Sequence, residues 1–167
     1  TQVIAQAPST GLLQGEPLTS LPQLVLNRIT EQAHHSPHSI AVVDSDRSLC
    51  YRDLLESAQR LATRLRAAGA EPGQLVAIHL PRSSKSIIAI LGILMSGAAY
   101  LALDPQAPPT RNAALLKDAA PILLLTSAEA APAITSAHQP QQILIEEQSP
   151  APSPTLLPHP ESSDLAY

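Results

Sequence analysis

The sequence predicts an α/β fold in which helices cover both faces of a mainly parallel β-sheet. Short apolar runs of strand type alternate along the chain with longer stretches of helical periodicity, a layout typical of parallel strands joined by crossover helices. The 167 residues are 44% hydrophobic, enough for one core. Because only 2% are aromatic, that core is expected to be aliphatic.

The first half of the chain contains two predicted helices and two short strands. A capping box of Ser20 and Gln23 opens a helix over 21–34. Its apolar residues are expected on one face: Leu21, Leu24, Val25 and Ile29. Strands over 40–43 and 48–51 follow, and then the clearest amphipathic helix, which closes on Gly69. Its apolar positions are Leu54, Leu55, Ala58, Leu61, Ala62, Leu65 and Ala68.

The second half begins with a buried type of strand over 75–80 and a helix over 87–95 that ends at Gly97. This helix is apolar on nearly every side, so both of its flanks need a covering surface. The remaining expected elements are a strand over 100–103, a helix opened by Pro108 or Pro109 that carries Leu115 and Leu116, a strand over 122–125, a weaker helix over 128–136 interrupted at Pro132, and a strand over 143–146.

Both ends of the chain differ from this core. Residues 1–19 show no sustained periodicity, and residues 149–160 hold five prolines in twelve positions, so both are expected to be linker or loop. We therefore divide the chain into a linker over 1–19 and one α/β domain over 20–167. The first residue is Thr, which suggests a piece of a longer protein.

Charge and composition exclude several partners. The net charge is −4, opposite in sign to what a phosphate backbone requires, and no aromatic platform is available for stacked bases. Nucleic acid is therefore not an expected partner. No apolar run approaches the roughly 20 residues that span a bilayer, and the lone Cys50 cannot form an internal disulfide. A cytoplasmic protein without a membrane partner is expected.

The candidates for metal and acid–base chemistry are weak. His34, His35 and His38 lie in a Ser/Pro-bearing loop without the fixed geometry of a zinc site. His79 lies inside a strand and is expected to be an interior histidine with satisfied hydrogen bonds. Asp44, Asp46 and Asp53 are separated by turns and predict no acid–base pair.

Nucleophiles and phosphate loops are equally poorly supported. None of the six glycines brackets a serine as a nucleophile elbow does, and Cys50 has no neighbouring histidine. The turn over 81–86 contains no glycine, so it is not a usual phosphate loop. This turn could still attract an anion through its arginine and its lysine, its serine hydroxyls and the free N–H groups of the helix start. A capped helix start is, however, the commoner explanation. The residues themselves therefore predict no catalytic, cofactor-binding or metal site.

Two segments nevertheless resemble a known family. Residues 49–54, Leu-Cys-Tyr-Arg-Asp-Leu, resemble the first core motif of nonribosomal peptide synthetase adenylation domains, L-[TS]-Y-x-E-L. Residues 92–105 resemble the second, L-K-A-G-x-A-Y-V-P-I-D, and Pro108 and Arg111 match a following P-x-x-R. Cys50, Asp53, Met95 and Ala102 depart from the usual pattern. The resemblance covers about residues 21–167.

The resemblance implies the first α/β lobe of an adenylate-forming enzyme, incomplete because the phosphate loop, pocket residues and catalytic lysine of that family lie beyond both motifs. A complete relative uses ATP and Mg²⁺ to convert an amino acid to an aminoacyl adenylate and loads it onto a carrier-protein thiol. In this chain both motifs are expected to have structural roles. Cys50 and Asp53 should form a weakened cap of the amphipathic helix that follows them, and Gly97 should form a left-handed turn. The 167 residues alone are expected to be inactive and to bind neither ATP nor a metal.

Two alternatives remain open from the sequence. The chain could be a docking or structural module, in which the rest of an adenylation domain or another protein covers the apolar helix over 87–95. The chain could also be a flavodoxin-like binding domain, because such domains have the same architecture.

Overall fold

Four parallel strands form the central sheet of the computed structural model, which describes residues 25–45, 47–129 and 140–146. The strands lie in the order β4-β3-β5-β6. Their bounds are β3 Leu75–His79, β4 Ala99–Ala102, β5 Leu123–Thr126 and β6 Gln141–Leu144. All three pairings are parallel, which confirms the predicted sheet.

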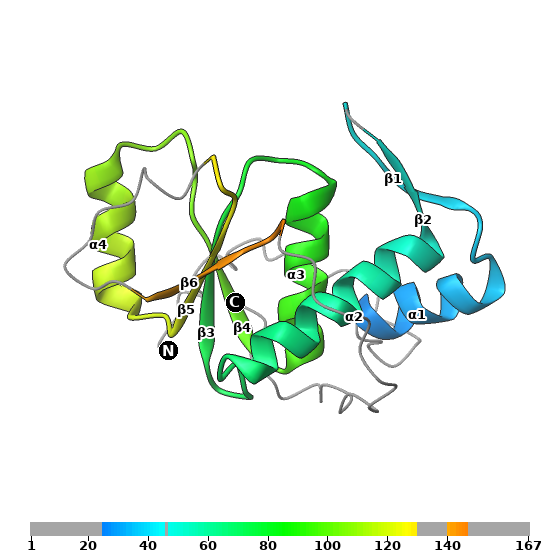
Figure 1. Cartoon of the computed structure of the whole chain (residues 1–167), viewed down its shortest axis with the longest axis horizontal. Coiled ribbons are helices and arrows are strands. Elements are labelled where there is room, and N and C mark those ends of the chain that lie inside the picture. Colours follow the sequence, from blue (N-terminus) through cyan, green and yellow to red (C-terminus); the bar gives the residue numbers. More distant parts are fainter. Residues whose placement is uncertain (1–24, 46, 130–139, 147–167) are drawn as a thin grey trace, which may run out of the picture.

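Helices cover both faces of this sheet, as Figure 1 shows. The helices α2 (Tyr51–Ala67) and α3 (Ser84–Ser96) lie on one face, and α4 (Pro109–Ala119) lies on the other. Side chains of a strand alternate between faces, and β3 follows this rule. Val76 and Ile78 belong to the core cluster shared with α2 and α3, whereas Ala77 packs in a second cluster with Leu116 of α4.

The apolar helix α3 is covered from within the chain. One flank faces β3 and β4, and α2 packs along another. The two helices approach closely because α3 has Gly92 at the crossing, where an added Cβ would lie 2.9 Å from Cδ2 of Leu61. The sequence predicted that α3 needs a covering surface on each flank, and α2 supplies most of the second one. Ile87 remains 39% exposed.

The first two strands do not join the parallel sheet. β1 (Ile40–Val43) and β2 (Ser48–Cys50) pair antiparallel as a separate two-stranded sheet. Figure 1 shows this hairpin rising from the end where α1 (Val25–His35) and α2 lie. The short turn between the strands favours antiparallel pairing, because a parallel crossover needs a dozen or more residues.

The structure corrects several boundaries. Tyr51 begins α2 rather than ending a strand, because its N–H and that of Arg52 donate to the carbonyls of Ser39 and Pro37, both at 3.0 Å. Val25 is 65% exposed, so its predicted place on the buried face of α1 is wrong, and Leu26 and Ala33 are buried instead. Residues 128–129 form a turn, not the start of a helix. β6 lies two residues earlier than predicted, and α3 begins three residues earlier.

Other predictions lie outside the described residues. These are the linker over 1–19, the capping box of Ser20 and Gln23, most of the helix over 128–136, and the proline-rich segment over 149–160.

Candidate functional site

Polar side chains collect where the parallel strands end. His79 ends β3 and pairs in register with Thr126, which ends β5. Asp104 follows β4, and Glu146 follows β6. In open α/β sheets ligands bind outside the carboxyl ends of the strands, so this edge is the candidate functional site.

The connections at this edge leave toward opposite faces. In Figure 1 the loop after β3 leads to α3, and the loop after β4 leads to α4 on the other side of the sheet. Because β3 and β4 are neighbours, the edge between them is a topological switch point.

The N-terminus of α3 already holds an anion supplied by the chain. The Ser84 N–H donates to Oδ2 of Asp44 at 2.6 Å, and Nε of Arg47 donates to the Ser84 hydroxyl at 2.8 Å. The other carboxylate oxygen of Asp44 accepts from the Arg47 N–H at 3.0 Å. A carboxylate at this position is stabilised by the helix dipole. The preferred explanation of the turn over 81–86, a capped helix start, is confirmed by the capping box of Ser83 and Ser86. The anion at this helix start is Asp44, which lies between β1 and β2.

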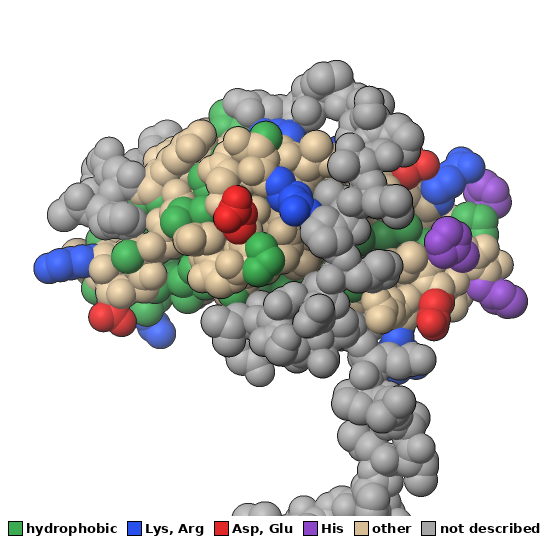
Figure 2. Space-filling model, turned by 90° about the horizontal axis from the view of Figure 1, so that it is seen from below, with side chains coloured by type: hydrophobic (Ala, Val, Ile, Leu, Met, Phe, Trp, Pro, Cys, Tyr) green, Lys and Arg blue, Asp and Glu red, His purple; other side chains and the backbone are tan. Residues whose placement is uncertain are grey.

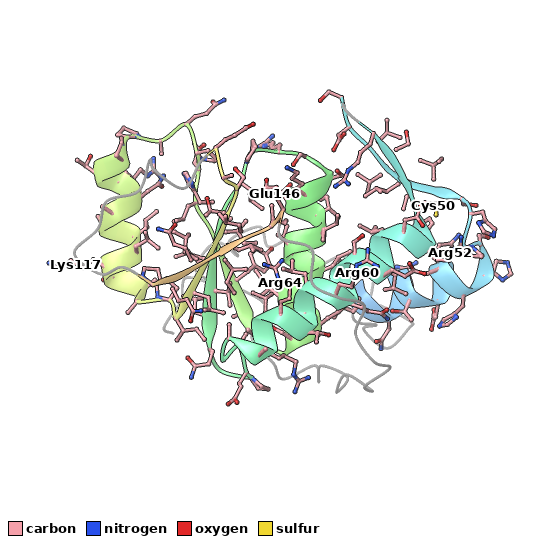
Figure 3. The ribbon with its side chains drawn as sticks, in the orientation of Figure 1. Cys50, Arg52, Arg60, Arg64, Lys117 and Glu146 are labelled. Atoms are coloured by element: carbon pink, nitrogen blue, oxygen red, sulfur yellow. The ribbon has the colours of Figure 1, made fainter. Side chains whose placement is uncertain are left out.

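Glu146 connects the end of β6 to α3. Its Oε1 accepts from Nζ of Lys85 at 2.8 Å, and its Oε2 accepts from the Ala128 N–H at 3.3 Å. Partial burial alone would raise the pKa of Glu146, but the hydrogen bonds from Lys85 and from backbone N–H groups outweigh it and lower that pKa. Figure 3 places Glu146 beside the first turns of α3. The pair links the end of β6 to the first turn of α3 at the sheet edge.

His79 is buried, with 2% of its surface exposed. Burial lowers the pKa of His79, against the opposing effect of the Asp104 carboxylate, and so favours the neutral ring. Its backbone carbonyl accepts from the Thr126 hydroxyl at 3.3 Å. The interior position predicted for His79 is confirmed, but its Nδ1 has no hydrogen-bond partner among the described residues.

The other candidate residues are not brought together. No group of three His, Cys, Asp or Glu side chains in the described part of the chain could hold a metal ion. His34 and His35 end α1 and His38 follows in a turn, and Figure 2 shows histidine side chains spread over one end of the molecule. Asp53 lies in the first turn of α2, and Asp46 lies outside the described residues.

The first family-like motif forms the start of α2. Cys50 is the N-cap residue, in extended conformation and half-buried, and its side chain makes no cap hydrogen bond. This confirms the weakened cap. The first N–H groups of the helix find carbonyls in the turn over 37–39 instead. Figure 3 shows Cys50 and Arg52 where β2 meets α2.

The second family-like motif forms the end of α3 and the following strand. Gly97 has φ +90° and ends α3 with its N–H donating to the Leu94 carbonyl, which confirms the predicted left-handed turn. A Cβ there would lie 3.1 Å from Pro72. Ala98 and Ala99 are buried and admit β4 against this turn. Both motifs therefore have structural roles here.

A shallow groove of about 710 Å³ lies along α1 at the end of the molecule opposite α4. Its lining mixes apolar and charged side chains: Val25, Arg28, Ile29, Glu31, Gln32, His35 and Tyr51. Nothing in this set forms an acid–base or nucleophilic arrangement.

Two residues with defined roles at the edge were missed by the sequence reasoning. Asp44 was considered only as an acid or base, because its partner Ser84 is 40 residues away. Asn112 was not considered, yet it is 3% exposed and its Nδ2 donates to the Asp104 carbonyl at 2.8 Å. A polar residue four positions before the buried Leu116, on the same face of α4, was the available signal.

Comparisons with known proteins identify the family. The model of the AMP-binding enzyme family matches residues 29–166. An isonitrile lipopeptide synthase of Streptomyces coeruleorubidus is 46% identical over 116 residues, which cover 70% of this chain and 8% of that protein. A dimodular nonribosomal peptide synthase of Bacillus subtilis is 40% identical over 117 residues, which cover 70% of this chain and 5% of that protein. The antimetabolite synthetase AmbB of Pseudomonas aeruginosa is 37% identical over 158 residues, covering 93% and 13%.

Solved structures agree. The nonribosomal peptide synthetase FmoA3, bound to α-methyl-L-serine-AMP, superimposes with a TM-score of 0.71 at 30% identity, over 79% of this chain and 15% of that one. A fatty acid AMP ligase of Legionella pneumophila shares the fold, with a TM-score of 0.63 at 22% identity, over 72% and 23%. The chain thus spans less than a quarter of each relative named here. It belongs to the AMP-binding enzyme family and corresponds to part of a nonribosomal peptide synthetase adenylation domain.

Proposed function

We propose that this chain is the scaffold portion of an adenylation domain that activates an amino acid for natural-product biosynthesis. The complete enzyme would use ATP and Mg²⁺ to form an aminoacyl adenylate and transfer the aminoacyl group to a carrier-protein thiol. We place it in the cytoplasm; no helix in the described residues could cross a membrane.

The observation that carries the proposal is the structural use of both motifs. The first motif starts α2, and the second lets α3 end and β4 begin within a packed core. At the start of α3, the Ser84 N–H donates to Asp44, and Nζ of Lys85 donates to Glu146, so both donors already have acceptors within the chain. The proposed role of these residues is therefore to position the sheet edge, while the groups that handle ATP come from other parts of the enzyme.

The apolar helix that suggested a docking module gives this alternative less support. α2 covers a flank of α3 that was expected to need the rest of an adenylation domain or another protein. The family match favours the enzyme portion over the flavodoxin-like alternative.

A hybrid enzyme tests the proposal. Residues 25–146 would replace the matching segment of a nonribosomal peptide synthetase adenylation domain of known specificity, and amino-acid-dependent ATP–pyrophosphate exchange would be measured. We expect the hybrid to keep exchange activity and the amino-acid preference of its host. The 167-residue chain alone is the control and should show no exchange above background.

Two results would contradict the proposal. Exchange by the 167-residue chain alone would show that it carries the chemistry. A folded hybrid that has lost exchange would show that these residues are not an equivalent scaffold.

A further inference from the structure

Two buried polar atoms at the switch point lack hydrogen-bond partners among the described residues. They are Nδ1 of His79, in β3, and Oδ1 of Asn112, in α4. Their side chains are 2% and 3% exposed. A buried polar atom without a partner costs about 1–3 kcal/mol, so each such atom needs an explanation.

The packing of α4 on the sheet places these atoms at the same level. Leu116 of α4 shares a core cluster with Ala77 of β3. From Ala77, two residues toward the carboxyl end of the strand reach His79 on the same face, about 6.6 Å along the strand. From Leu116, four residues toward the N-terminus of α4 reach Asn112, about 6 Å along the helix. Because α4 runs antiparallel to the strands it connects, both steps lead to the same end of the interface.

Asp104 interacts with both Asn112 and His79. The Asn112 amide donates to the Asp104 carbonyl at 2.8 Å, and the Asp104 carboxylate acts electrostatically on His79. The Leu103 N–H donates to the Ile78 carbonyl at 2.8 Å, so the chain that follows β4 continues beside the end of β3. No direct hydrogen bond joins His79 to Asn112.

The chemistry of the two atoms defines what fits between them. The amide oxygen of Asn112 only accepts hydrogen bonds. Burial lowers the pKa of His79, which favours the neutral ring, and a neutral imidazole has one nitrogen that accepts a hydrogen bond. With Nδ1 as that nitrogen, a small molecule with two donor hydrogens satisfies both atoms, and water is the usual occupant of such sites in proteins.

We propose that His79 and Asn112 bind one buried water molecule, which donates one hydrogen to Nδ1 of His79 and the other to Oδ1 of Asn112. The bound water joins β3 to the first turn of α4 and fixes the loop over 103–108 between them. Asp104 holds the same loop from within, since its Oδ1 accepts from the Gln106 N–H at 2.9 Å. The site belongs to the fold of this chain and does not depend on the proposed enzyme activity.

The direct test is nuclear magnetic resonance of the isotopically labelled 167-residue chain at pH 7.5. We expect a cross-peak between water and the side-chain protons of Asn112 or His79. The cross-peak should be absent from Asn112→Leu and retained in Asp118→Leu, a matched change at an exposed position of α4. Absence of the cross-peak from the unmodified chain, or its persistence in Asn112→Leu, would overturn the proposal.

A second measurement needs no variant and therefore holds even if Asn112→Leu does not fold. The ¹⁵N chemical shifts of the His79 ring in the unmodified chain identify the protonated nitrogen. We expect the proton on Nε2 and a hydrogen-bonded shift at Nδ1. A proton on Nδ1, or the shift of an Nδ1 that accepts no hydrogen bond, would contradict the bound water.

Discussion

Ala120 ends α4 in the left-handed region, at φ 43° and ψ 53°. It is the one residue other than glycine with positive φ among the described residues. A Cβ in this conformation costs about 1–2 kcal/mol, which glycine avoids. The helix therefore ends in strain that its sequence does not relieve.

Replacing this residue should stabilise the chain. We expect Ala120→Gly to raise the free energy of unfolding by about 0.5–1 kcal/mol, because relief of strain exceeds the added entropy of the unfolded glycine. Urea unfolding followed by circular dichroism measures it. Ala119→Gly, one residue earlier within α4, should instead lose about 0.5–1 kcal/mol. Equal effects of the two changes would contradict the strain at Ala120.

His79 makes stability depend on pH. Burial lowers its pKa in the folded state below the unfolded value of about 6.5, so the unfolded chain binds the proton more tightly. The contribution of His79 is therefore fully present above pH 6.5 and is lost as pH falls through its folded pKa. Thermal unfolding between pH 8 and pH 5 should show this loss. In His79→Leu the fall over this range should be smaller; an unchanged fall would assign the pH dependence to other groups.

At the scale of elements, the crossing of α2 and α3 holds the core together. Gly92 allows this crossing, because a Cβ there would lie 2.9–3.0 Å from three carbon atoms of Leu61. These are tighter than ordinary contacts, and overpacking of a core costs about 1–3 kcal/mol.

Gly92→Ala should consequently destabilise the chain, although alanine has the higher helix propensity by about 1 kcal/mol. In the Leu61→Ala background the same change should become neutral or stabilising, since the obstructing side chain is gone. Chemical unfolding of the four chains of this double-mutant cycle measures the coupling. The same destabilisation in both backgrounds would contradict a Gly92–Leu61 contact.

The contact between the β1–β2 hairpin and α3 depends on Asp44. We expect Asp44→Ala to lower the free energy of unfolding by about 0.5–2 kcal/mol, the usual range for a lost helix cap. Asp44→Asn keeps an acceptor but loses the charge, so its smaller effect should fade as salt rises. As a control, Asp118→Asn removes a carboxylate near the C-terminus of α4 and should be neutral or stabilising. A loss in Asp118→Asn as large as that in Asp44→Asn would argue against the helix dipole.

The sequence predicted the elements whose signal is local. The periodicity of α2, the apolar run of α3 and the turn at Gly97 each lie within one segment, and the structure confirms them. The hairpin was expected as two strands without a stated pairing. The start of α2 was misplaced because its first N–H groups bind carbonyls in the turn over 37–39, which no cap residue reveals.

The polar edge was harder to predict, since its contacts join distant segments. Asp44 binds Ser84 across 40 residues, and Lys85 binds Glu146 across 61. The water site proposed for Asn112 and His79 requires α4 to pack on the sheet. From residue types alone we expected no catalytic arrangement. How these polar groups are arranged could be seen only in the folded chain.

At the scale of the whole molecule, the described residues form a parallel sheet with helices on both faces and polar contacts along its carboxyl edge. The polar groups at this edge are hydrogen-bonded to one another. Asp44 accepts from the Ser84 N–H at the start of α3, and Glu146 accepts from Lys85. Our proposal for the whole molecule is that these residues support a nucleotide site whose binding groups lie elsewhere in the enzyme.

Binding of ATP to the purified 167-residue chain tests that claim most directly. Isothermal titration calorimetry would be carried out with and without Mg²⁺, using a complete adenylation domain of the same family as the positive control. We predict no saturable heat of binding to the chain in either condition. Saturable binding that requires Mg²⁺ would contradict the account.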